Sequence, residues 1–285
     1  MNRKKFQWPV GLALGVLHVG ALAALIPAFF SWSALGVAIA LWWFTGAMGI
    51  ALCFHRTLTH RSVVLPRPFE YLTALFGTLA LQGGPIEWVA THRLHHAHAD
   101  AEGDPHDAHR GLWWSHIDWL YRKNDARPNE DEMRRYAADL WAQPYYRFLQ
   151  RYYLWIQVAL GLVLFAVGGI GWVVWGLFVR TVFVYHITWF VNSAAHRFGY
   201  RTYRTTDLST NCWWVALLTW GEGWHNNHHA FPSSARHGLR WFEFDPTWIS
   251  IKLLKLVRLV RDVKLPTQAM QERLAMPRSQ VQTEP

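Results

Sequence analysis

The chain has 285 residues and a formal net charge of +9, and 52% of its residues are hydrophobic, including 19 Trp. The mean hydropathy is only +0.01, so the apolar residues must be concentrated in segments. Two cysteines exclude a disulfide framework. The basic residues form no stripe with interleaved aromatic side chains, which argues against a nucleic-acid partner. The length fits a single domain, residues 1–285.

Two uncharged apolar runs follow a short basic start at residues 1–5. The runs, residues 10–30 and 34–54, are each long enough to cross a bilayer, which takes about 20 helical residues. Only Ser31, Trp32 and Ser33 separate them, so we predict a transmembrane hairpin over residues 10–54. His55 lies directly at its exit.

The next segments are too short or too polar to cross a membrane. Residues 69–81 are apolar but fall well below the length of a span, so we predict an interfacial or re-entrant helix. Residues 97–151 carry both charges and several prolines, which indicates a soluble segment.

A second apolar block covers residues 152–195 and contains a single charge, Arg180. The glycines at 168, 169 and 171 predict a turn between helices at about 153–167 and 172–191. A charge within a span must face protein or water, so Arg180 either has a functional role or forms an internal ion pair. Residues 211–220 form another short apolar, interfacial stretch.

The C-terminal region alternates basic and aliphatic residues, which predicts a basic amphipathic helix on a membrane surface. Its basic residues are Lys252, Lys255, Arg258, Arg261 and Lys264. The last dozen residues are expected to be disordered.

The four predicted spans place both termini on one side of the membrane. The links near Ser31 and Gly169 carry no Lys or Arg, whereas basic residues crowd the other side, which is therefore cytoplasmic. We thus expect an all-α, multi-pass integral membrane protein, in the inner or plasma membrane of a bacterium if the source is bacterial. Its hairpins are residues 10–54 and 153–195, and its cytoplasmic helical cap comprises residues 55–152 and 196–285.

Sixteen histidines are far more than structural need explains. Nine fall into three short clusters and one outlier, and the topology puts all nine on the cytoplasmic side: His55, His60, His92, His95, His96, His196, His225, His228 and His229. On a helix His92 and His96 share a face, while the neighbours His95 and His96 point about 100° apart. One cluster can therefore supply two metal ions, and nine ligands are too many for one ion.

Other residues near the clusters have less certain roles. His55 and His60 are five residues apart, which does not align on an α-helix, so we expect a helix to end near residues 57–59. Cys53 is a candidate thiolate ligand, although a small buried hydrophobe is the simpler interpretation. The remaining histidines near the clusters or in the last span are expected to be structural: His98, His106, His109, His116, His186 and His237.

The spacing of these clusters resembles that of the membrane fatty acid desaturases. The motifs are His-x4-His, His-x2-His-His, Asn-x3-His from Asn192 to His196, and a second His-x2-His-His. Further matching pieces are Asp104-Pro-His106 and Gly221-Glu-Gly-Trp-His225-Asn. The resemblance covers about residues 55–232 with the same four-span plan, and it is closest to the Δ9 type.

The resemblance implies a centre of two Fe²⁺ ions held by the nine histidines, with Asn192 reached through a water. One iron would take His55, His60, His96 and His229, and the other His92, His95, His196, His225 and His228. Three acidic residues close to the clusters would orient imidazoles or cap helices: Asp100, Asp104 and Glu222.

The implied chemistry is O2-dependent insertion of a cis double bond at the Δ9 position of a saturated acyl chain, with O2 reduced to water. No haem-binding domain, Cys-x2-Cys motif or flavin fingerprint is visible, so electrons would come from a ferredoxin or a cytochrome b5-like protein and its reductase. Such carriers are often acidic, and a chain of charge +9 would attract them.

The resemblance also implies which residues contact the acyl chain of the substrate, next to the membrane lipid. Gln82, Trp88, Thr188 and Trp189 would surround its bend, and Ala47 and Trp43 would close the methyl end of the tunnel, unless they simply pack. Residues 82–91 offer few polar or charged groups to a CoA headgroup. The sequence therefore leaves the acyl carrier open between CoA and a lipid.

Two alternatives remain from the residues alone. A hydroxylase on the same scaffold, acting on acyl chains or alkanes, also begins with hydrogen abstraction. A membrane metal carrier would use His as transient ligands, but such ligands are expected near the bilayer midplane rather than at one face.

Overall fold

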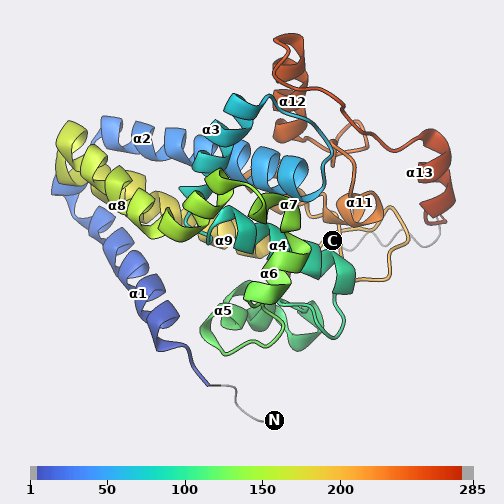
Figure 1. The fold of residues 1–285 in the computed structure, drawn as a ribbon, viewed down its shortest axis with the longest axis horizontal. Coiled ribbons are helices and arrows are strands. Elements are labelled where there is room, and N and C mark those ends of the chain that lie inside the picture. The colour runs from blue at the N-terminus through green and yellow to red at the C-terminus, as the bar shows by residue number, and fades with distance from the viewer. Residues whose placement is uncertain (1–4, 278–285) are drawn as a thin grey trace.

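The computed structural model describes residues 5–277, and the regular elements within them are helices (Figure 1). Residues 1–4 and 278–285 lie outside the described part, so most of the basic start and of the segment expected to be disordered falls there.

The described part contains three helices long and apolar enough to cross a membrane: Trp8–Leu25, Trp32–Thr59 and Pro144–His196. The first comprises α1 (Trp8–Leu22) and a short 3₁₀ turn, and the second comprises α2 (Trp32–Trp42) and the π-helix η3 (Trp43–Thr59). Ser31 begins α2 by accepting a hydrogen bond from the amide of Ala34. The two apolar runs therefore form helices where the sequence predicts them.

The third helix doubles back on itself at Gly169. It comprises α8 (Pro144–Val173), η6 (Val174–Val179), α9 (Arg180–Ser193) and η7 (Ala194–His196). Gly169 has φ 69° and ψ −166°, a conformation open to glycine but costly for other residues. Gly161 then faces Leu177, and Gly176 faces Leu164, as in an antiparallel pair. The predicted turn at the glycine cluster is confirmed.

The prediction that a helix ends near residues 57–59 is confirmed, but the pitch of that helix was not predicted. The π-helix η3 continues to Thr59, and the amide of His60 donates to the carbonyl of His55 over 3.1 Å. Thr57 and Thr59 also donate their hydroxyls to carbonyls five residues earlier. A π-helix repeats its hydrogen bonds at five-residue separation, so residues five apart approach each other. The two imidazole centroids are 4.8 Å apart.

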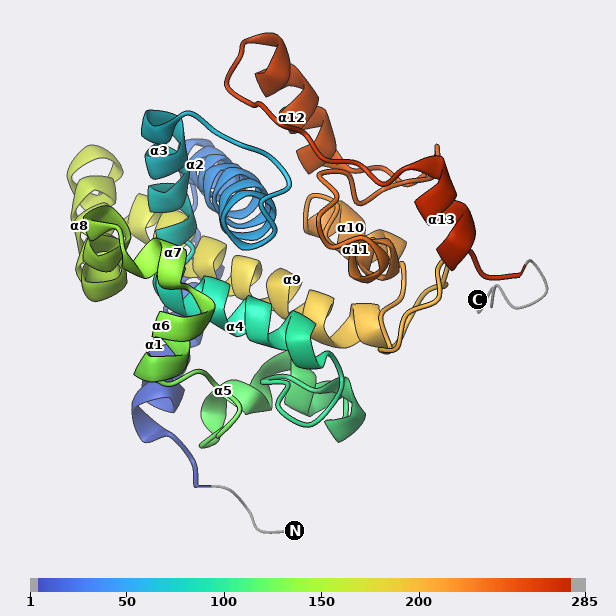
Figure 2. The same ribbon diagram turned by 45° about the vertical axis from the view of Figure 1, so that its right-hand side comes forward.

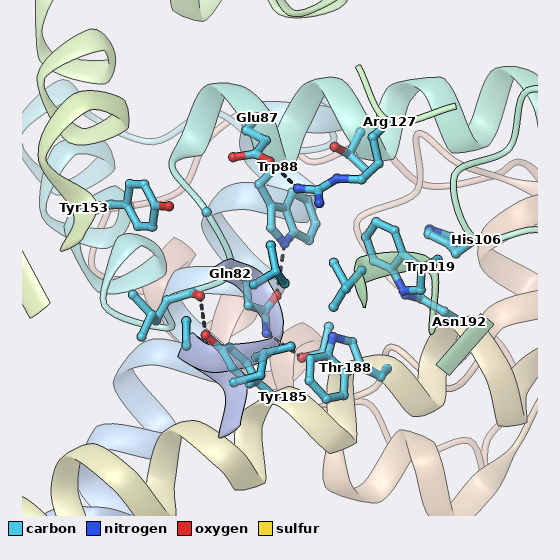
Figure 3. A pocket seen from close by; sticks show the side chains of 18 of the residues that line it. Gln82, Glu87, Trp88, His106, Trp119, Arg127, Tyr153, Tyr185, Thr188 and Asn192 are labelled. Atoms are coloured by element: carbon cyan, nitrogen blue, oxygen red, sulfur yellow. Dashed lines mark hydrogen bonds and ion pairs between the residues drawn. The ribbon is translucent and has the colours of Figure 1, made fainter. Parts of the chain in front are cut away.

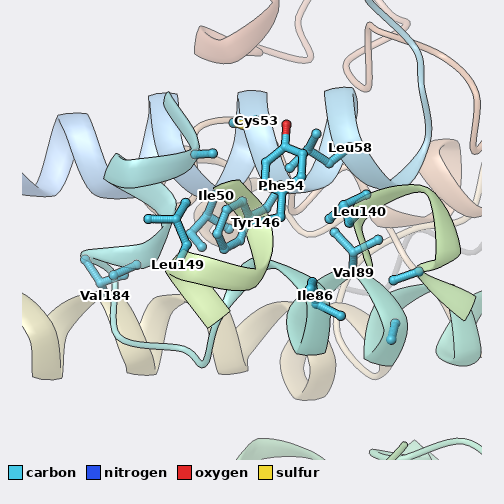
Figure 4. Close-up of a cluster of buried hydrophobic side chains, with 14 residues drawn as sticks. Ile50, Cys53, Phe54, Leu58, Ile86, Val89, Leu140, Tyr146, Leu149 and Val184 are labelled. Carbon is cyan, nitrogen blue, oxygen red and sulfur yellow. The ribbon is translucent and has the colours of Figure 1, made fainter. Parts of the chain in front are cut away.

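A buried apolar cluster joins the helices that carry the first two histidine clusters (Figure 4). Phe54 and Leu58 of η3 pack with Ile86 and Val89 of α4 (Pro85–His98) and with Tyr146 of α8. Phe54 and Ile86 are fully buried, and burial of each such side chain contributes about 1.5–3 kcal/mol. The cluster therefore fixes His55 relative to α4.

Gly49 lets η3 and α3 (Arg67–Thr78) approach closely. A Cβ at Gly49 would lie 2.3 Å from the backbone nitrogen of Gly77, which cannot move without separating the helices. We expect Gly49→Ala to destabilise the protein by about 1–3 kcal/mol, the usual effect of overpacking. Thermal melting in detergent measures the change.

Gly15 of α1 provides the matched control, since nothing lies within 4 Å of a Cβ built there. Gly15→Ala should leave the melting temperature unchanged or raise it slightly, because alanine favours a helix by about 0.5–1 kcal/mol. Equal melting temperatures for the two variants would contradict the close approach at Gly49.

Shorter helices surround one end of the long ones (Figure 2). Between the hairpins lie η4 (Ala108–Arg110), η5 (Trp114–Asp118), α5 (Trp119–Tyr121), α6 (Glu130–Tyr136) and α7 (Ala138–Trp141). After η7 come α10 (Trp213–Leu218), α11 (His225–Ala230), α12 (Pro246–Leu256) and α13 (Gln268–Leu274). Figure 2 shows α11 enclosed between the end of α9, α4 and the C-terminal elements.

The predicted basic C-terminal helix is only half correct. Lys252 and Lys255 lie on α12, but the helix ends at Leu256. Arg261 instead exchanges backbone hydrogen bonds with Val64, which fastens this segment to the chain after His60.

Candidate metal centre and substrate pocket

The nine histidines converge into two adjacent groups. The first group, group A, has five members: His55, His60, His92, His96 and His228. The other, group B, has four members: His95, His196, His225 and His229. Within each group one possible ligand atom per residue lies within 4.8 Å of all the others.

Consecutive histidines go to different groups, as the geometry of a helix predicts. His95 and His96 lie on α4, and His228 and His229 lie on α11, with one member of each pair in each group. The rings of His96 and His229 are 4.6 Å apart, so the groups adjoin. The division implied by the resemblance is wrong at three residues, because His92 and His228 lie in group A and His229 lies in group B.

The spacing of the ring nitrogens suits a bound metal ion. The Nε2 atoms of His55 and His228 are 3.1 Å apart, those of His228 and His96 2.9 Å, and those of His96 and His92 3.1 Å. In group B the Nε2 atoms of His95 and His229 are 3.4 Å apart. Two imidazoles on one ion, each about 2.0–2.1 Å from it, would be separated by about 2.8–3.4 Å.

Buried ring nitrogens without a hydrogen-bond partner support the same interpretation. Nε2 of His60 and Nε2 of His196 have none within the described residues. An unpaired buried nitrogen costs free energy unless a ligand satisfies it. The residues therefore fit a centre that holds metal ions.

Four carboxylates each contact the Nδ1 atom of one imidazole, on the side of the ring away from Nε2. Nδ1 of His95 lies 2.9 Å from Asp104, Nδ1 of His196 lies 2.7 Å from Asp100, and Nδ1 of His229 lies 2.8 Å from Asp207. Nδ1 of His55 contacts Glu222. Each carboxylate leaves Nε2 free for a metal, an arrangement that fixes the tautomer and raises the basicity of the ligand.

Burial and neighbouring charges shift the pKa of most of these imidazoles and of the carboxylates. Burial lowers the pKa well below the usual value for five ligands, with neighbouring imidazoles adding to the effect: His60, His92, His96, His225 and His228. Burial also lowers the pKa of His229 to about 4.

The pKa values of the four carboxylates are also lowered, but by charges and hydrogen bonds rather than by burial. Burial alone would raise the pKa of Asp104, but the charge and hydrogen bond of His95 outweigh it and hold the pKa well below its usual range. The same balance, with their own histidines, lowers the pKa of Asp100, Asp207 and Glu222. Burial opposes ionisation of His95, yet Asp104 raises the pKa of that imidazole.

The sequence predicts Asp100, Asp104 and Glu222 as neighbours of the histidines but misses three other residues. Asp207 lies in a loop outside every motif, so its position gives no signal. His237, expected to be structural, is fully buried and has Nδ1 3.3 Å from Glu222. Arg56 is fully buried, pairs with Asp245 and Glu222 at 3.0 Å each, and adjoins His55 in the sequence.

Several other candidates lie away from the two groups. Sγ of Cys53 is buried and faces the carbonyl of Glu70, so it is not part of either group. His186 contacts His18 and His116 at 3.1 and 3.0 Å, and these rings form a separate chain. Arg180 donates to the carbonyls of Gly176 and Leu79, so these hydrogen bonds are to backbone oxygens rather than to a carboxylate.

A pocket of about 430 Å³ reaches group A (Figure 3). His92 lines it, as does Asn192 on α9, and its size is that of a ligand site. The wall toward the N-terminus comes from apolar residues of α1: Pro9, Val10, Ala13, Leu14 and Leu17. Tyr153 and Leu154 of α8 complete a predominantly apolar channel between two candidate spans.

Four of the six expected substrate residues line this pocket, and hydrogen bonds connect three of them. Nε1 of Trp88 donates to Gln82 over 3.1 Å, and Nε2 of Gln82 donates to Thr188 over 2.9 Å. Trp189 lines the same wall. Trp43 and Ala47 do not line it; the ring of Trp43 instead packs 4.7 Å from that of Trp220.

Residues 30–252 match the family model described as fatty acid desaturase. The chain belongs to the fatty acid desaturase family. It is 55% identical over 264 residues to the sn-1 stearoyl-lipid 9-desaturase of Anabaena variabilis, covering 93% of this chain and 96% of that one. It is 52% identical to the sn-1 stearoyl-lipid 9-desaturase of Synechocystis sp., covering 91% and 80%.

A relative named for a different acyl carrier is also similar. The icosanoyl-CoA 5-desaturase of Limnanthes douglasii is 48% identical, covering 92% of this chain and 74% of the relative. Membership of the desaturase family therefore establishes an oxidoreductase, while relatives at similar identity differ in the carrier named.

Proposed function

We propose that this desaturase introduces a cis Δ9 double bond into a saturated acyl chain bound in a membrane lipid. The observation that carries the proposal is a largely apolar pocket that ends on His92 of the metal centre. The relatives named stearoyl-lipid 9-desaturases support the position of the bond and the carrier.

Two iron ions bound by groups A and B would supply the activation of O2 and the removal of two hydrogens from adjacent methylene groups. The nine histidines would hold these ions, and Asn192, which lines the pocket, would reach one of them through a water. The overall reaction converts CH2–CH2, O2, two electrons and two protons into CH=CH and two water molecules. The electrons would come from a ferredoxin or a cytochrome b5-like carrier and its reductase.

The protein's own contribution is to present one stretch of the chain to the centre. Trp88, Gln82 and Thr188 form a hydrogen-bonded line across the pocket, which fixes their side chains where the acyl chain would bend. Apolar walls exclude water from the reacting carbons. Trp43 and Ala47 would act further along the second span, beyond this pocket.

The charges at the pocket favour a lipid over CoA as the carrier. Arg127 is the one Arg or Lys among the lining residues, and it pairs with Glu87 over 2.7 Å. A CoA headgroup carries several phosphate charges and calls for several free cations. The apolar walls from α1 and α8, which belong to candidate spans, support entry of the acyl chain from the bilayer.

We further propose that α1, the α2–η3 helix and the two arms around Gly169 make four spans. The helix that ends before His60 and the helix that ends at His196 would then finish on the same side of the membrane, together with both termini and the metal centre. The basic residues on that side indicate that it is cytoplasmic. The apolar composition of the three candidate helices and the reversal at Gly169 support this plan.

Expression in a host that lacks unsaturated fatty acids tests the function. We expect O2-dependent accumulation of Δ9 monounsaturated acyl chains, with label appearing in membrane lipid before the CoA pool. A hydroxy product without a new olefin would support a hydroxylase instead. Metal movement across vesicles without any O2-dependent product would support a metal carrier.

Gln82→Leu removes the middle of the hydrogen-bonded line. We expect a loss of about 1–3 kcal/mol in transition-state stabilisation, which corresponds to a roughly 5- to 100-fold lower kcat/KM. Thr188→Ser keeps the hydroxyl and should retain most of the rate. Product analysis should show double bonds at additional positions for Gln82→Leu only; unchanged rate and position would remove this role.

A further inference from the structure

The carboxylates around the metal centre are distributed unequally between its two groups. Three of the four imidazole–carboxylate pairs belong to group B: His95 with Asp104, His196 with Asp100, and His229 with Asp207. Group A has one such pair, His55 with Glu222. All four carboxylates are buried.

The negative charge of these carboxylates matters because an imidazole that binds a metal ion through Nε2 brings no negative charge to it. A buried divalent cation that is surrounded only by neutral imidazoles retains its full charge in a medium of low dielectric constant, which is costly. Two dications carry four positive charges, and the four carboxylates carry four negative charges. The centre as a whole is therefore balanced, although its two halves are not.

Arg56 weakens the single carboxylate of group A further. Its guanidinium lies 3.0 Å from Oε1 of Glu222, so a fixed positive charge already shares this carboxylate. Asp245 also pairs with Arg56, and His237 also contacts Glu222. In group B the partners of Asp104 beyond His95 are backbone amides and the imidazole of His106, and no Arg or Lys among the described residues pairs with it.

Solvent access differs in the same direction. In group B three of the four members are buried, with relative exposures of 4% or less, and His229 is half-buried. In group A, three of the five members are only half-buried: His60, His92 and His96. His92 also lines the substrate pocket. Opposite charges attract more strongly where water is excluded. Each carboxylate of group B therefore stabilises a bound cation more than an equally distant carboxylate in water would.

We propose that the two metal positions are unequal, and that group B binds a divalent ion first and more tightly while group A is the exchangeable position. Group A has one more imidazole, which works against this order. An outer carboxylate typically contributes 10- to 100-fold to metal affinity, and group B has two more of them. This inference rests on the proposed two-metal centre.

The test is a metal titration of the purified full chain after removal of metal with a chelator. Zn²⁺ serves as a redox-inert probe, with bound metal measured by mass spectrometry and calorimetry. We expect two ions per chain in two separate steps, with affinities at least about 100-fold apart. Two ions in a single step would overturn the inequality and leave the two-metal proposal standing; fewer than two ions would overturn both.

Substitutions assign each step to its group. Asp104→Asn should weaken the tight step by about 10- to 100-fold and leave the weak step unchanged, while Glu222→Gln should weaken only the weak step. If Asp104→Asn folds poorly, Asp207→Asn serves in its place and should weaken the tight step in the same way. Asp139→Asn is the control, because this carboxylate pairs with Arg93 and Arg61 and touches no imidazole.

The opposite assignment is equally measurable. If Asp104→Asn and Asp207→Asn weaken the looser step, group A is the tight position and the proposed order is reversed. If all three substitutions weaken both steps to the same degree, the charges act on the centre as a whole and the inequality is absent. Melting curves of each metal-free variant show that the fold is retained.

Discussion

His228→Ala is expected to abolish desaturation while the chain still inserts into the membrane. Nε2 of His228 lies 3.1 Å from that of His55 and 2.9 Å from that of His96, at the centre of group A. Removing it takes a nitrogen from the middle of the proposed ligand set and leaves a buried gap. Turnover should fall to background, and bound metal should fall from about two ions per chain to about one.

His109→Ala is the matched control, because His109 is an exposed histidine in the segment between α4 and α8 and lies outside both groups. This variant should keep wild-type activity and metal content. Near-wild-type turnover of His228→Ala would refute the shared site, and loss of membrane insertion in that variant alone would mark the residue as structural.

Arg56→Met is expected to have the largest effect on stability. Arg56 is fully buried and donates to Asp245, Glu222 and the carbonyl of Ala235. Removing one partner of a buried ion pair typically costs about 3–5 kcal/mol, because the remaining charge is left uncompensated. Thermal melting in detergent should show a large decrease in the melting temperature.

Asp245→Asn in the Arg56→Met background separates charge from packing. The double variant no longer buries the unpaired Asp245, so it should recover part of the lost stability. Asp245 also caps α12 through the amide of Trp248, and asparagine can keep that hydrogen bond. A double variant less stable than Arg56→Met would show that packing, rather than the unpaired charge, accounts for the loss.

The helices and the histidine set could be predicted from the sequence because their signals are local. Apolar runs as long as residues 10–30 and 34–54 identify helices without any tertiary information. The four-residue spacing of His92 and His96 identifies a shared face in the same way. The turn at Gly169 followed from glycine chemistry alone.

Features that depend on tertiary contacts could not be predicted. Asp207 comes from a loop 22 residues before its partner His229, and no periodicity connects them. The placing of both His92 and His228 in group A depends on how α4 and α11 face each other across the centre. The end of the basic helix at Leu256 depends on the pairing of Arg261 with Val64.

The π-helix before His60 has a consequence for comparing relatives of this chain. Its wide turn holds His55 and His60 together across five residues, whereas an α-helix would hold a pair four residues apart. Removal of one residue between these histidines would replace the five-residue spacing of the π-helix by the four-residue spacing of an α-helix. The two imidazoles would still be adjacent. An alignment gap of one residue between these histidines is therefore a change of pitch, and it is compatible with an intact metal centre.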